Sequence, residues 1–412
     1  MVLRSVWEDD RVPETMPPVE VEGHHDVVVV GGGLTGITTA LLLASAGRSV
    51  LVLEARHLGA GTTGGSTAKV SALQGTRLSA IARRHSIETV RHYVQGNLEG
   101  LAWLRRFCEE HEVTSQTRTA YTYATTDSGA RQVEEEHRVA TDAGLDAVLT
   151  PGLALPFPTT AAVGLPDQMQ VDPVELLHVL AGEAVRRGAT IVEEARVHRV
   201  RGNQPTRVET GSGSVTADVV VVATNLPVLD RGGHFARLKP ARSYGLAYRG
   251  WDAALDGMYL SADSPTRSLR DALVRGDRVL LVGGEGHTTG RDPSPRRRLE
   301  ALRSWTAEYF PGLEETHAWS AQDYLPAHEL PLVGPVLPDS EHLLMAGGYA
   351  KWGLTNSVAA SLALASRLLG GRTDWAEAMT GWSRHELTGL PHAALFNAEV
   401  GLEMTRGWLA PL

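Results

Sequence analysis

Cysteine is almost missing from this sequence. Cys108 is the only cysteine among 412 residues, which excludes an intrachain disulfide, a cysteine-rich zinc site and a protein-bound iron–sulfur cluster within these residues. Cys108 lies in a helical pattern over residues 101–113, where we expect a buried and unreactive thiol. No pair of histidines or carboxylates has the spacing of metal ligands, so we expect no metal.

Long apolar runs are also missing. Residues 1–18 contain no apolar core of signal-peptide length, and apolar runs elsewhere are interrupted within about 10 residues. We therefore expect a cytoplasmic protein with no membrane span. The sequence has no low-complexity tract and no repeat of solenoid period, and its length suits two compact units.

Basic charge is not in excess. The formal net charge is −9, and lysine and arginine are scattered along the chain rather than gathered on one helix face. Nucleic acid is therefore not an expected partner.

A βαβ pattern is the clearest positive signal, and it covers residues 26–55. A β-branched run leads into glycines in G-x-G-x-x-G spacing, then an apolar helix and a second strand that ends at Glu54. Gly31 permits a tight turn, Gly33 lets the backbone approach a pyrophosphate, and Gly36 lets helix and strand pack closely. Glu54 is placed to accept hydrogen bonds from a ribose, so the pattern predicts a dinucleotide site.

Similar material recurs at residues 173–223 and 342–369, each with a buried strand and a helix. Between these stretches, helical patterns at 86–112 and 129–143 alternate with short strands around 117–125 and 242–286. We expect an α/β protein in which a discontinuous dinucleotide-binding domain is combined with a second α+β domain on a mixed or antiparallel sheet. The expected boundaries are 1–85, 166–238 and 322–412 for the first domain, and 86–165 and 239–321 for the second.

The run GTTGGSTAKVSALQG, residues 61–75, favours FAD over NAD as the dinucleotide. An NAD site needs mainly the first βαβ unit, whereas FAD must be covered along its whole length, including a buried ring. Small residues at 61–75 and a glycine turn at 347–353 meet that need.

Four stretches, residues 31–55, 59–75, 319–336 and 347–361, resemble the D-amino-acid-oxidase-type FAD-dependent oxidoreductases. The resemblance is greatest to the γ-glutamylputrescine oxidase and glycine-oxidase-like branch, whose members often carry a C-terminal Rieske domain. With one cysteine, the sequence leads us to expect no Rieske domain. The resemblance implies a Rossmann-like FAD domain of the glutathione-reductase type.

The resemblance also assigns residues to FAD. The run at 61–75 would pass beside the pyrophosphate and one face of the isoalloxazine, and the helix that begins near Leu354 or Thr355 would point its positive end at the flavin. Where covalent relatives have a cysteine or a histidine, this chain has Gln322 and Lys69, so we expect noncovalent FAD. The expected FAD-binding residues are Gly31, Gly33, Leu34, Thr35, Gly36, Glu54, Ala55, Gly61, Thr62, Thr63, Ser66, Thr67, Ala68, Lys69, Val197, Ala223, Thr224, Gly347, Gly348, Lys351, Trp352, Gly353, Leu354 and Thr355.

The implied reaction is oxidation of a C–N bond of an amine or amino acid to an imine by hydride transfer to flavin N5. Lys351 matches a lysine that holds the substrate carboxylate in sarcosine-oxidase-like relatives, although a solvated loop lysine is the alternative. Arg242 and Tyr244 begin a strand over the flavin, where Arg242 could equally be a structural ion-pair partner. Trp352 and Tyr324 are aromatic candidates for the cavity wall. Four further residues are weaker candidates and are more simply explained as structural, namely Tyr121, Tyr123, His287 and His328.

The electron acceptor and the substrate stay open. Sarcosine-oxidase relatives have an oxygen-activating lysine in a strand that matches residues 280–287, and this chain has none there. This absence favours a dehydrogenase with a separate redox protein as acceptor over an oxidase that uses O2. Two other functions remain: an NAD(P)H-dependent flavin monooxygenase, and a flavin-bound electron-transfer or scaffold subunit.

Overall fold

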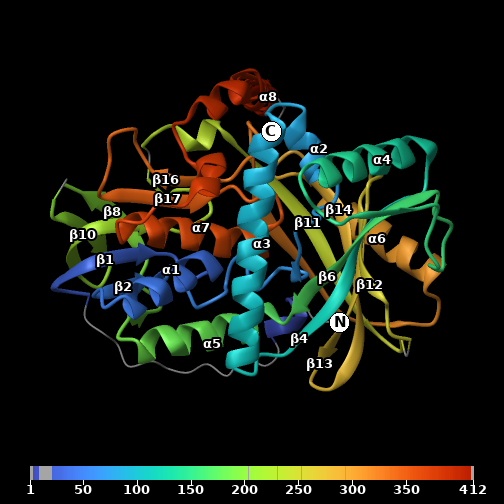
Figure 1. The fold of residues 1–412 in the computed structure, drawn as a ribbon, viewed down its shortest axis with the longest axis horizontal. Coiled ribbons are helices and arrows are strands. Elements are labelled where there is room, and N and C mark those ends of the chain that lie inside the picture. The colour runs from blue at the N-terminus through green and yellow to red at the C-terminus, as the bar shows by residue number, and fades with distance from the viewer. Residues whose placement is uncertain are drawn as a thin grey trace.

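The protein, examined as a computed structural model, is described over residues 3–8, 21–202, 204–229, 231–251, 253–292 and 294–409. Two β-sheets lie side by side, with the long helix α3 (Ile87–Glu110) crossing between them (Figure 1). Most of the N-terminal stretch in which we found no signal peptide lies outside the described residues.

The first sheet is mainly parallel. Its strand order is β16-β17-β10-β1-β2-β7, with β1 parallel to both β10 and β2 and with β16 antiparallel to β17. Strands β8 and β9 extend it as an antiparallel pair beside β10. The bounds are β1 (His24–Val30), β2 (Val50–Leu53), β7 (Thr190–Val192), β8 (Val197–Arg201), β9 (Thr206–Thr210), β10 (Ser214–Val222), β16 (Leu332–Pro335) and β17 (Leu343–Gly347).

The run of valines in β1 is buried on both faces. Val27 and Val29 belong to one apolar core, and Val28 and Val30 belong to another on the opposite side of the sheet. Such continuous burial is typical of a parallel strand covered by structure on both sides. The βαβ unit expected at residues 26–55 and the α/β fold class are therefore confirmed.

Three helices cover the first sheet, and their ends follow from local sequence signals. α1 and α7 pack together, and α5 packs on α1. At the start of α5, the Asp172 carboxylate accepts the N–H groups of Val174 and Glu175 at 2.8 and 3.1 Å, and Gly188 follows its end with a φ of +96°. The bounds are α1 (Leu34–Ser45), α5 (Pro173–Arg186) and α7 (Gly353–Leu368).

The second sheet is mixed, in the order β15-β11-β14-β13-β12-β4-β6-β3, with β5 beside β6. β12 and β4 are parallel, whereas β11 is antiparallel to both β14 and β15. The strand bounds are β3 (Lys69–Val70), β4 (Ser115–Ala124), β5 (Val148–Thr150), β6 (Ala161–Val171), β11 (Leu238–Arg249), β12 (Gly257–Ser261), β13 (Arg267–Val274), β14 (Asp277–Thr288) and β15 (Glu314–Pro326).

The remaining helices lie around the second sheet and at the C-terminal end of the chain. α4 and α6 lie on the side away from the first sheet, and α8 lies at the top in Figure 1. The remaining bounds are α2 (Arg77–Ala82), α4 (Asp127–Asp142), α6 (Pro295–Tyr309), α8 (Leu390–Leu409) and the 3-10 helices η1 (Val6–Glu8), η2 (His234–Ala236), η3 (Asp374–Met379) and η4 (Arg384–Gly389).

The expected division into two domains stays a prediction. β6 and β15 each cross one of its boundaries, at residues 166 and 322, and both pair within the second sheet. α3, which the division assigns to the second domain, packs against α7 beside the first sheet. Their close approach depends on Gly100, where a Cβ would lie 2.9 Å from the carbonyl oxygen of Thr355.

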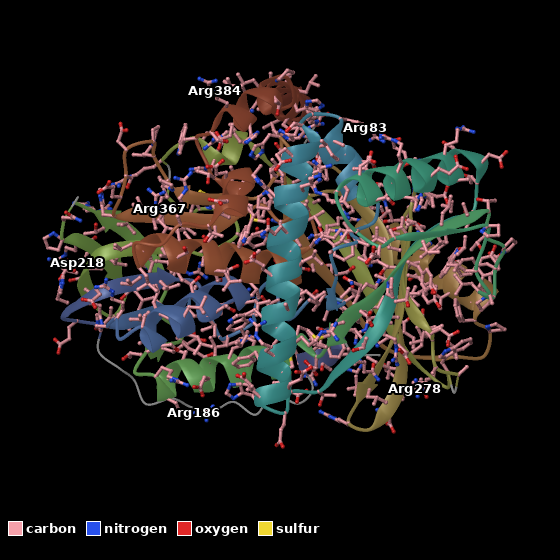
Figure 2. All side chains as sticks on the ribbon, in the orientation of Figure 1. Arg83, Arg186, Asp218, Arg278, Arg367 and Arg384 are labelled. Atoms are coloured by element: carbon pink, nitrogen blue, oxygen red, sulfur yellow. The ribbon has the colours of Figure 1, made fainter. Side chains whose placement is uncertain are left out.

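Charged side chains are spread over the surface. Arg83, Arg186, Arg278 and Arg384 lie at well-separated points of the outline in Figure 2. Among the residues that the structure describes, no helix combines the length and the apolar character needed to cross a bilayer.

Gly36→Ala should destabilise the fold, because a Cβ at Gly36 would lie 1.9 Å from the carbonyl oxygen of Gly31. The matched control is Gly182→Ala in α5, where a Cβ meets no atom within 4 Å. We expect Gly36→Ala to lower the free energy of unfolding by about 1–3 kcal/mol or more, and Gly182→Ala to raise it by about 0.5–1 kcal/mol. Urea unfolding measures both, and equal effects would contradict the close packing of α1 on β1.

Candidate functional site

The N-terminus of α1 forms the centre of a long cleft at the carboxyl ends of β1, β2 and β10. Gly31 turns the chain with a φ of +113°, and a Cβ there would lie 2.8 Å from the carbonyl oxygen of Ala223. Gly33 precedes the helix without a side-chain cap, and the N–H of Leu34 bonds to Oγ1 of Thr63 at 3.2 Å. The other N–H groups of the first turn are available to an anion.

Glu54 lies at the end of β2 and lines the same cleft. Its two carboxylate oxygens accept the backbone N–H groups of Gly32 and Arg56 at 2.7 and 2.8 Å. These bonds fix the carboxylate at the edge of the sheet, and each oxygen keeps a further lone pair for a hydroxyl donor.

The long cleft fits FAD in its chemistry. It encloses about 1620 Å³ between its atoms, open solvent included. Gly31 and Gly33 leave room for a close backbone approach, the start of α1 suits a pyrophosphate, and Glu54 suits a ribose.

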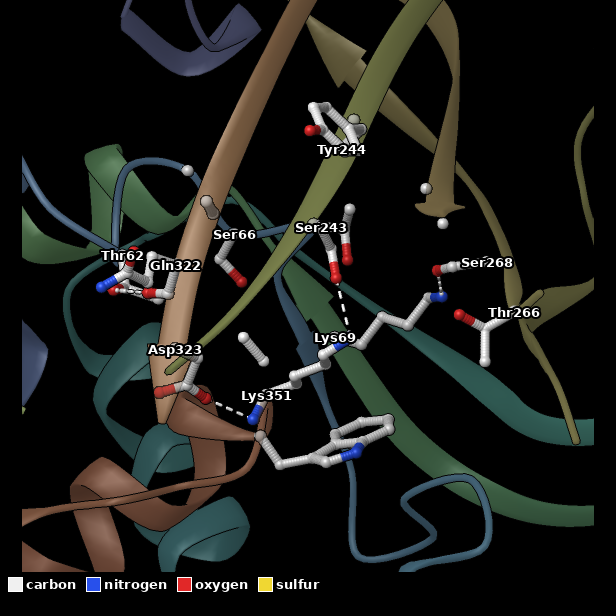
Figure 3. A pocket seen from close by; sticks show the side chains of 18 of the residues that line it. Thr62, Ser66, Lys69, Ser243, Tyr244, Thr266, Ser268, Gln322, Asp323 and Lys351 are labelled. Carbon is white, nitrogen blue, oxygen red and sulfur yellow. Dashed lines mark hydrogen bonds between the residues drawn. The ribbon is translucent and has the colours of Figure 1, made fainter. Parts of the chain in front are cut away.

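A second cavity, here the inner cavity, adjoins the long cleft and encloses about 1030 Å³ between its atoms, open solvent included. It lies under β11, β13, β14 and β15 of the second sheet and at the start of α7 (Figure 3). α7 also begins without a side-chain cap, so its positive end faces the junction. Five residues line both spaces, namely Thr62, Ser66, Asp323, Lys351 and Leu354.

Lys351 is held at this junction by a left-handed turn. Ala350 and Lys351 have φ values of +50° and +75°, which non-glycine residues rarely adopt. The Asp323 carboxylate accepts the backbone N–H of Lys351 and, at 2.6 Å, an amide hydrogen of Asn225. The turn thereby directs the ammonium of Lys351 to Oγ of Ser243, 2.7 Å away (Figure 3).

The charge of Lys351 is only partly balanced. The side chain of Lys351 is exposed to the two cavities that it lines. Burial lowers the pKa of its ammonium, and the Asp323 charge opposes that shift. Burial also raises the pKa of the Asp323 carboxyl, whose hydrogen bonds oppose the change. Lys351 therefore offers a hydrogen-bond donor with positive charge to an anion at the junction.

Lys69, on β3, lines the inner cavity and is 8% exposed. Its ammonium donates to the carbonyl oxygen of Tyr259 at 2.8 Å and to Oγ of Ser268. Burial, and secondarily the charge of Arg270, lower the pKa of Lys69 to about 7. The whole sequence has three lysines, so two of the three line this one cavity.

The rest of the inner cavity is lined by apolar side chains and by the hydroxyl groups of serine and threonine. Trp319, Trp352, Tyr244 and Leu260 form much of its wall, and Asp323 is the only carboxylate among the described lining residues. The serine and threonine residues of the lining are Thr62, Ser66, Thr67, Ser243, Thr266 and Ser268. In the described ranges, no three His, Cys, Asp or Glu side chains gather where they could hold a metal ion.

Most of the residues expected at the FAD site line one of the two spaces. These are Gly31, Gly33, Leu34, Thr35, Glu54, Ala55, Gly61, Thr62, Thr63, Ser66, Val197, Ala223, Thr224, Lys351, Gly353 and Leu354 in the long cleft, and Thr67, Lys69 and Trp352 in the inner cavity. Among the expected catalytic residues, Lys351, Trp352 and Tyr244 line the inner cavity.

The other expected residues lie behind these walls. Arg242 contacts Ser320 and Gln322 of β15 at 3.4 Å while its neighbour Ser243 faces the cavity, and Tyr324 accepts a hydrogen bond from Gln322. Gly36 and Gly347 serve close packing, since a Cβ would lie 1.9 and 2.0 Å from backbone oxygens. The expected residues in neither lining are Gly36, Ala68, Arg242, Tyr324, Gly347, Gly348 and Thr355, together with the weaker candidates Tyr121, Tyr123, His287 and His328.

Several lining residues are missing from the sequence-based expectation. Asn225 and Asp323 act through the turn at Lys351, and Tyr349 reaches Thr35 in α1 with its hydroxyl at 2.9 Å. Trp319 and Ser268 come from the second sheet. The one signal for them in the sequence is the scarcity of lysine, which draws attention to Lys69 and Lys351 and hence to their neighbours.

Similarity to known proteins points to the same cofactor. The model of the DAO family, described as FAD dependent oxidoreductase, matches residues 26–367. The protein YhfW of Bacillus subtilis (strain 168), whose name describes a Rieske 2Fe-2S iron–sulfur protein, is 28% identical over 98% of this chain and 80% of its own length. Gamma-glutamylputrescine oxidoreductase of Escherichia coli (strain K12) is 25% identical over 50% of each chain.

The fold is similar to that of a solved structure, glycine oxidase from Geobacillus kaustophilus. The TM-score is 0.72 at 20% identity, and the match covers 85% of this chain and 96% of the other. At that identity the match establishes the fold alone.

Lys69→Met should change how stability depends on pH. Lys69 has a pKa of about 7 in the folded protein against an ordinary value of 10.5, so the unfolded chain binds more protons between these values. This difference makes the wild type more stable as pH rises across that window. The variant's free energy of unfolding should therefore exceed that of wild type by most below pH 7, and this difference should shrink toward pH 10.

Urea unfolding of the FAD-free protein at pH 6, 8 and 10 measures this difference. Lys239→Met is the matched control, because Lys239 lines neither cavity and pairs with Glu399. A difference between Lys69→Met and wild type that stays constant with pH would contradict the burial of this charge.

Proposed function

Because the chain belongs to the DAO family of FAD-dependent oxidoreductases, we propose that it oxidises a C–N bond of an amino acid, or of another amine that carries an anionic group, to an imine. The observation that carries this proposal is the presence of Lys69 and Lys351 in an inner cavity whose one lining carboxylate, Asp323, is engaged by Asn225 and by the backbone. Bound FAD supplies the acceptor for two electrons.

The residues of the inner cavity would bind and orient the substrate. Lys351 donates a charge-assisted hydrogen bond to the anionic group, and Trp319 and Trp352 pack on the apolar part and exclude water. The substrate loses a hydride from carbon and a proton from nitrogen, and water then hydrolyses the imine. A simple cationic amine would meet the charge of Lys351 and, below about pH 7, that of Lys69 as well, which favours an amino acid over a polyamine.

The position of Lys69 favours O2 as an electron acceptor. The ammonium of Lys69 contacts Ser268, and Ser268 pairs with Gly283 of β14. β14 is the strand that matches the one with the oxygen-activating lysine in sarcosine-oxidase relatives. A cation from β3 in this place would stabilise the negative charge that O2 acquires on reduction. We therefore propose O2 as an acceptor, beside a separate redox protein.

An anaerobic titration tests the function. The flavin colour of the purified holoenzyme is followed while amino acids of both hands, the matching amines without a carboxylate, and NAD(P)H are added, and air is then admitted. We expect bleaching by an amino acid but not by its decarboxylated analogue, and a rapid return of colour in air. Bleaching by NAD(P)H alone would instead identify a monooxygenase, and no bleaching by any compound would favour an electron-transfer or scaffold subunit.

Lys351→Met should weaken substrate binding. Loss of a hydrogen bond to a charged group costs about 1.5–3 kcal/mol, so the amino-acid concentration that gives half-maximal bleaching should rise about 10- to 150-fold. Lys239→Met makes the same substitution outside the cavities and should leave that concentration unchanged. An unchanged value in Lys351→Met would exclude Lys351 as the anion-binding group.

A further inference from the structure

The backbone at residues 65–68, between the long cleft and the inner cavity, has an unusual set of partners. Each of its four carbonyl oxygens accepts a hydrogen bond from a buried side chain. Trp319 bonds to Gly65 at 2.9 Å through its indole N–H, and Trp7 bonds to Ser66 at 2.8 Å in the same way. Arg270 bonds to the carbonyl oxygens of Thr67 and Ala68 at 3.0 and 2.7 Å.

These three donors, here the carbonyl clamp of Trp7, Arg270 and Trp319, come from distant parts of the chain. Trp7 lies in η1, Arg270 in β13 and Trp319 in β15. They are 2%, 2% and 9% exposed. The guanidinium carbon of Arg270 lies 5.5 Å from the centre of the Trp7 ring, so the two donors also contact each other by a cation–π interaction.

The clamp holds a conformation that the loop does not prefer. Ala68 has a φ of +55° and is fully buried. A left-handed non-glycine residue costs free energy and persists only where its surroundings enforce it. Arg270 holds the carbonyl of Ala68, and Oγ of Ser66 accepts its N–H at 3.0 Å.

Three of the four clamped residues line the cavities. Ser66 lines both spaces, Gly65 and Thr67 line the inner cavity, and so does Lys69, which follows the clamped segment. With all four carbonyls engaged by these donors, the loop presents the hydroxyls of Ser66 and Thr67 to the cavities. A carbonyl released from the clamp would be free to rotate toward the ligand and to displace those hydroxyls.

We infer that Trp7, Arg270 and Trp319 are positioning residues for FAD, which act by fixing the four carbonyls of residues 65–68. Trp7 lies outside residues 26–367, the part that matches the family model, so family membership does not imply this role. The inference concerns binding of the cofactor and holds whatever the substrate.

Trp7→Phe tests the inference, because it keeps an aromatic ring and removes the N–H that bonds to Ser66. Trp375→Phe is the matched control: Trp375 is 2% exposed, and its indole N–H has no hydrogen-bond partner among the described residues. We expect the dissociation constant of FAD, measured by flavin fluorescence on apoprotein, to rise about tenfold in Trp7→Phe and to stay unchanged in Trp375→Phe. The visible absorption bands of bound FAD should shift in Trp7→Phe alone.

A purely structural role for Trp7 gives a different result. Trp7→Phe would then lower the melting temperature of the apoprotein, while FAD affinity and the flavin spectrum stayed as in wild type, and that outcome would overturn the inference. Trp319→Phe removes the bond to Gly65 and provides a second variant if Trp7→Phe does not fold. We expect weaker FAD binding in it as well, and unchanged affinity would count equally against the clamp.

Discussion

The packing of α1 on β1 is the constraint on which the site depends. Gly36 and Gly31 approach so closely that a single Cβ would lie 1.9 Å from a carbonyl oxygen. This contact sets the direction of α1, so that its uncapped N-terminus points to the edge where the parallel strands β1, β2 and β10 end. Glu54 follows one of these strands directly, and Ala223 follows another. The same edge therefore collects an anion site, a carboxylate and a turn of small residues.

The long cleft and the inner cavity differ in the charged groups that line them. The long cleft offers N–H groups to a pyrophosphate and a carboxylate to a ribose, whereas the inner cavity carries the ammonium groups of Lys69 and Lys351. Asp323 balances only part of that charge, and its oxygens accept hydrogen bonds from the backbone N–H of Lys351 and the amide of Asn225. Arg270 adds a further buried cation beside Lys69. A neutral or cationic ligand would gain little from such a cavity, and an anion would gain much.

The parts of the site that the sequence predicts are those encoded locally. The turn at Gly31–Gly36 and the acid at Glu54 are recognisable because one βαβ unit contains them in fixed spacing. Arg242 lines neither cavity, whereas Ser243 and Tyr244 line the inner one. β11 shifts register against β14 between Arg242 and Tyr244, and the local sequence does not reveal such a shift. Asp323 and Trp7 act through contacts with residues 28 and 59 positions away, and no sequence period reveals those contacts.

The carbonyl clamp and the cavity walls also determine when, during synthesis of the chain, the FAD pocket becomes complete. Its donors span residues 7–319, and the cavity walls continue to Leu354 and Ser357 in α7. A chain still growing on the ribosome therefore has the glycine turn of the first strand long before it has a complete pocket. We therefore expect firm retention of FAD only after α7 has been synthesised, because Gly353, Leu354 and Ser357 complete the wall of the long cleft.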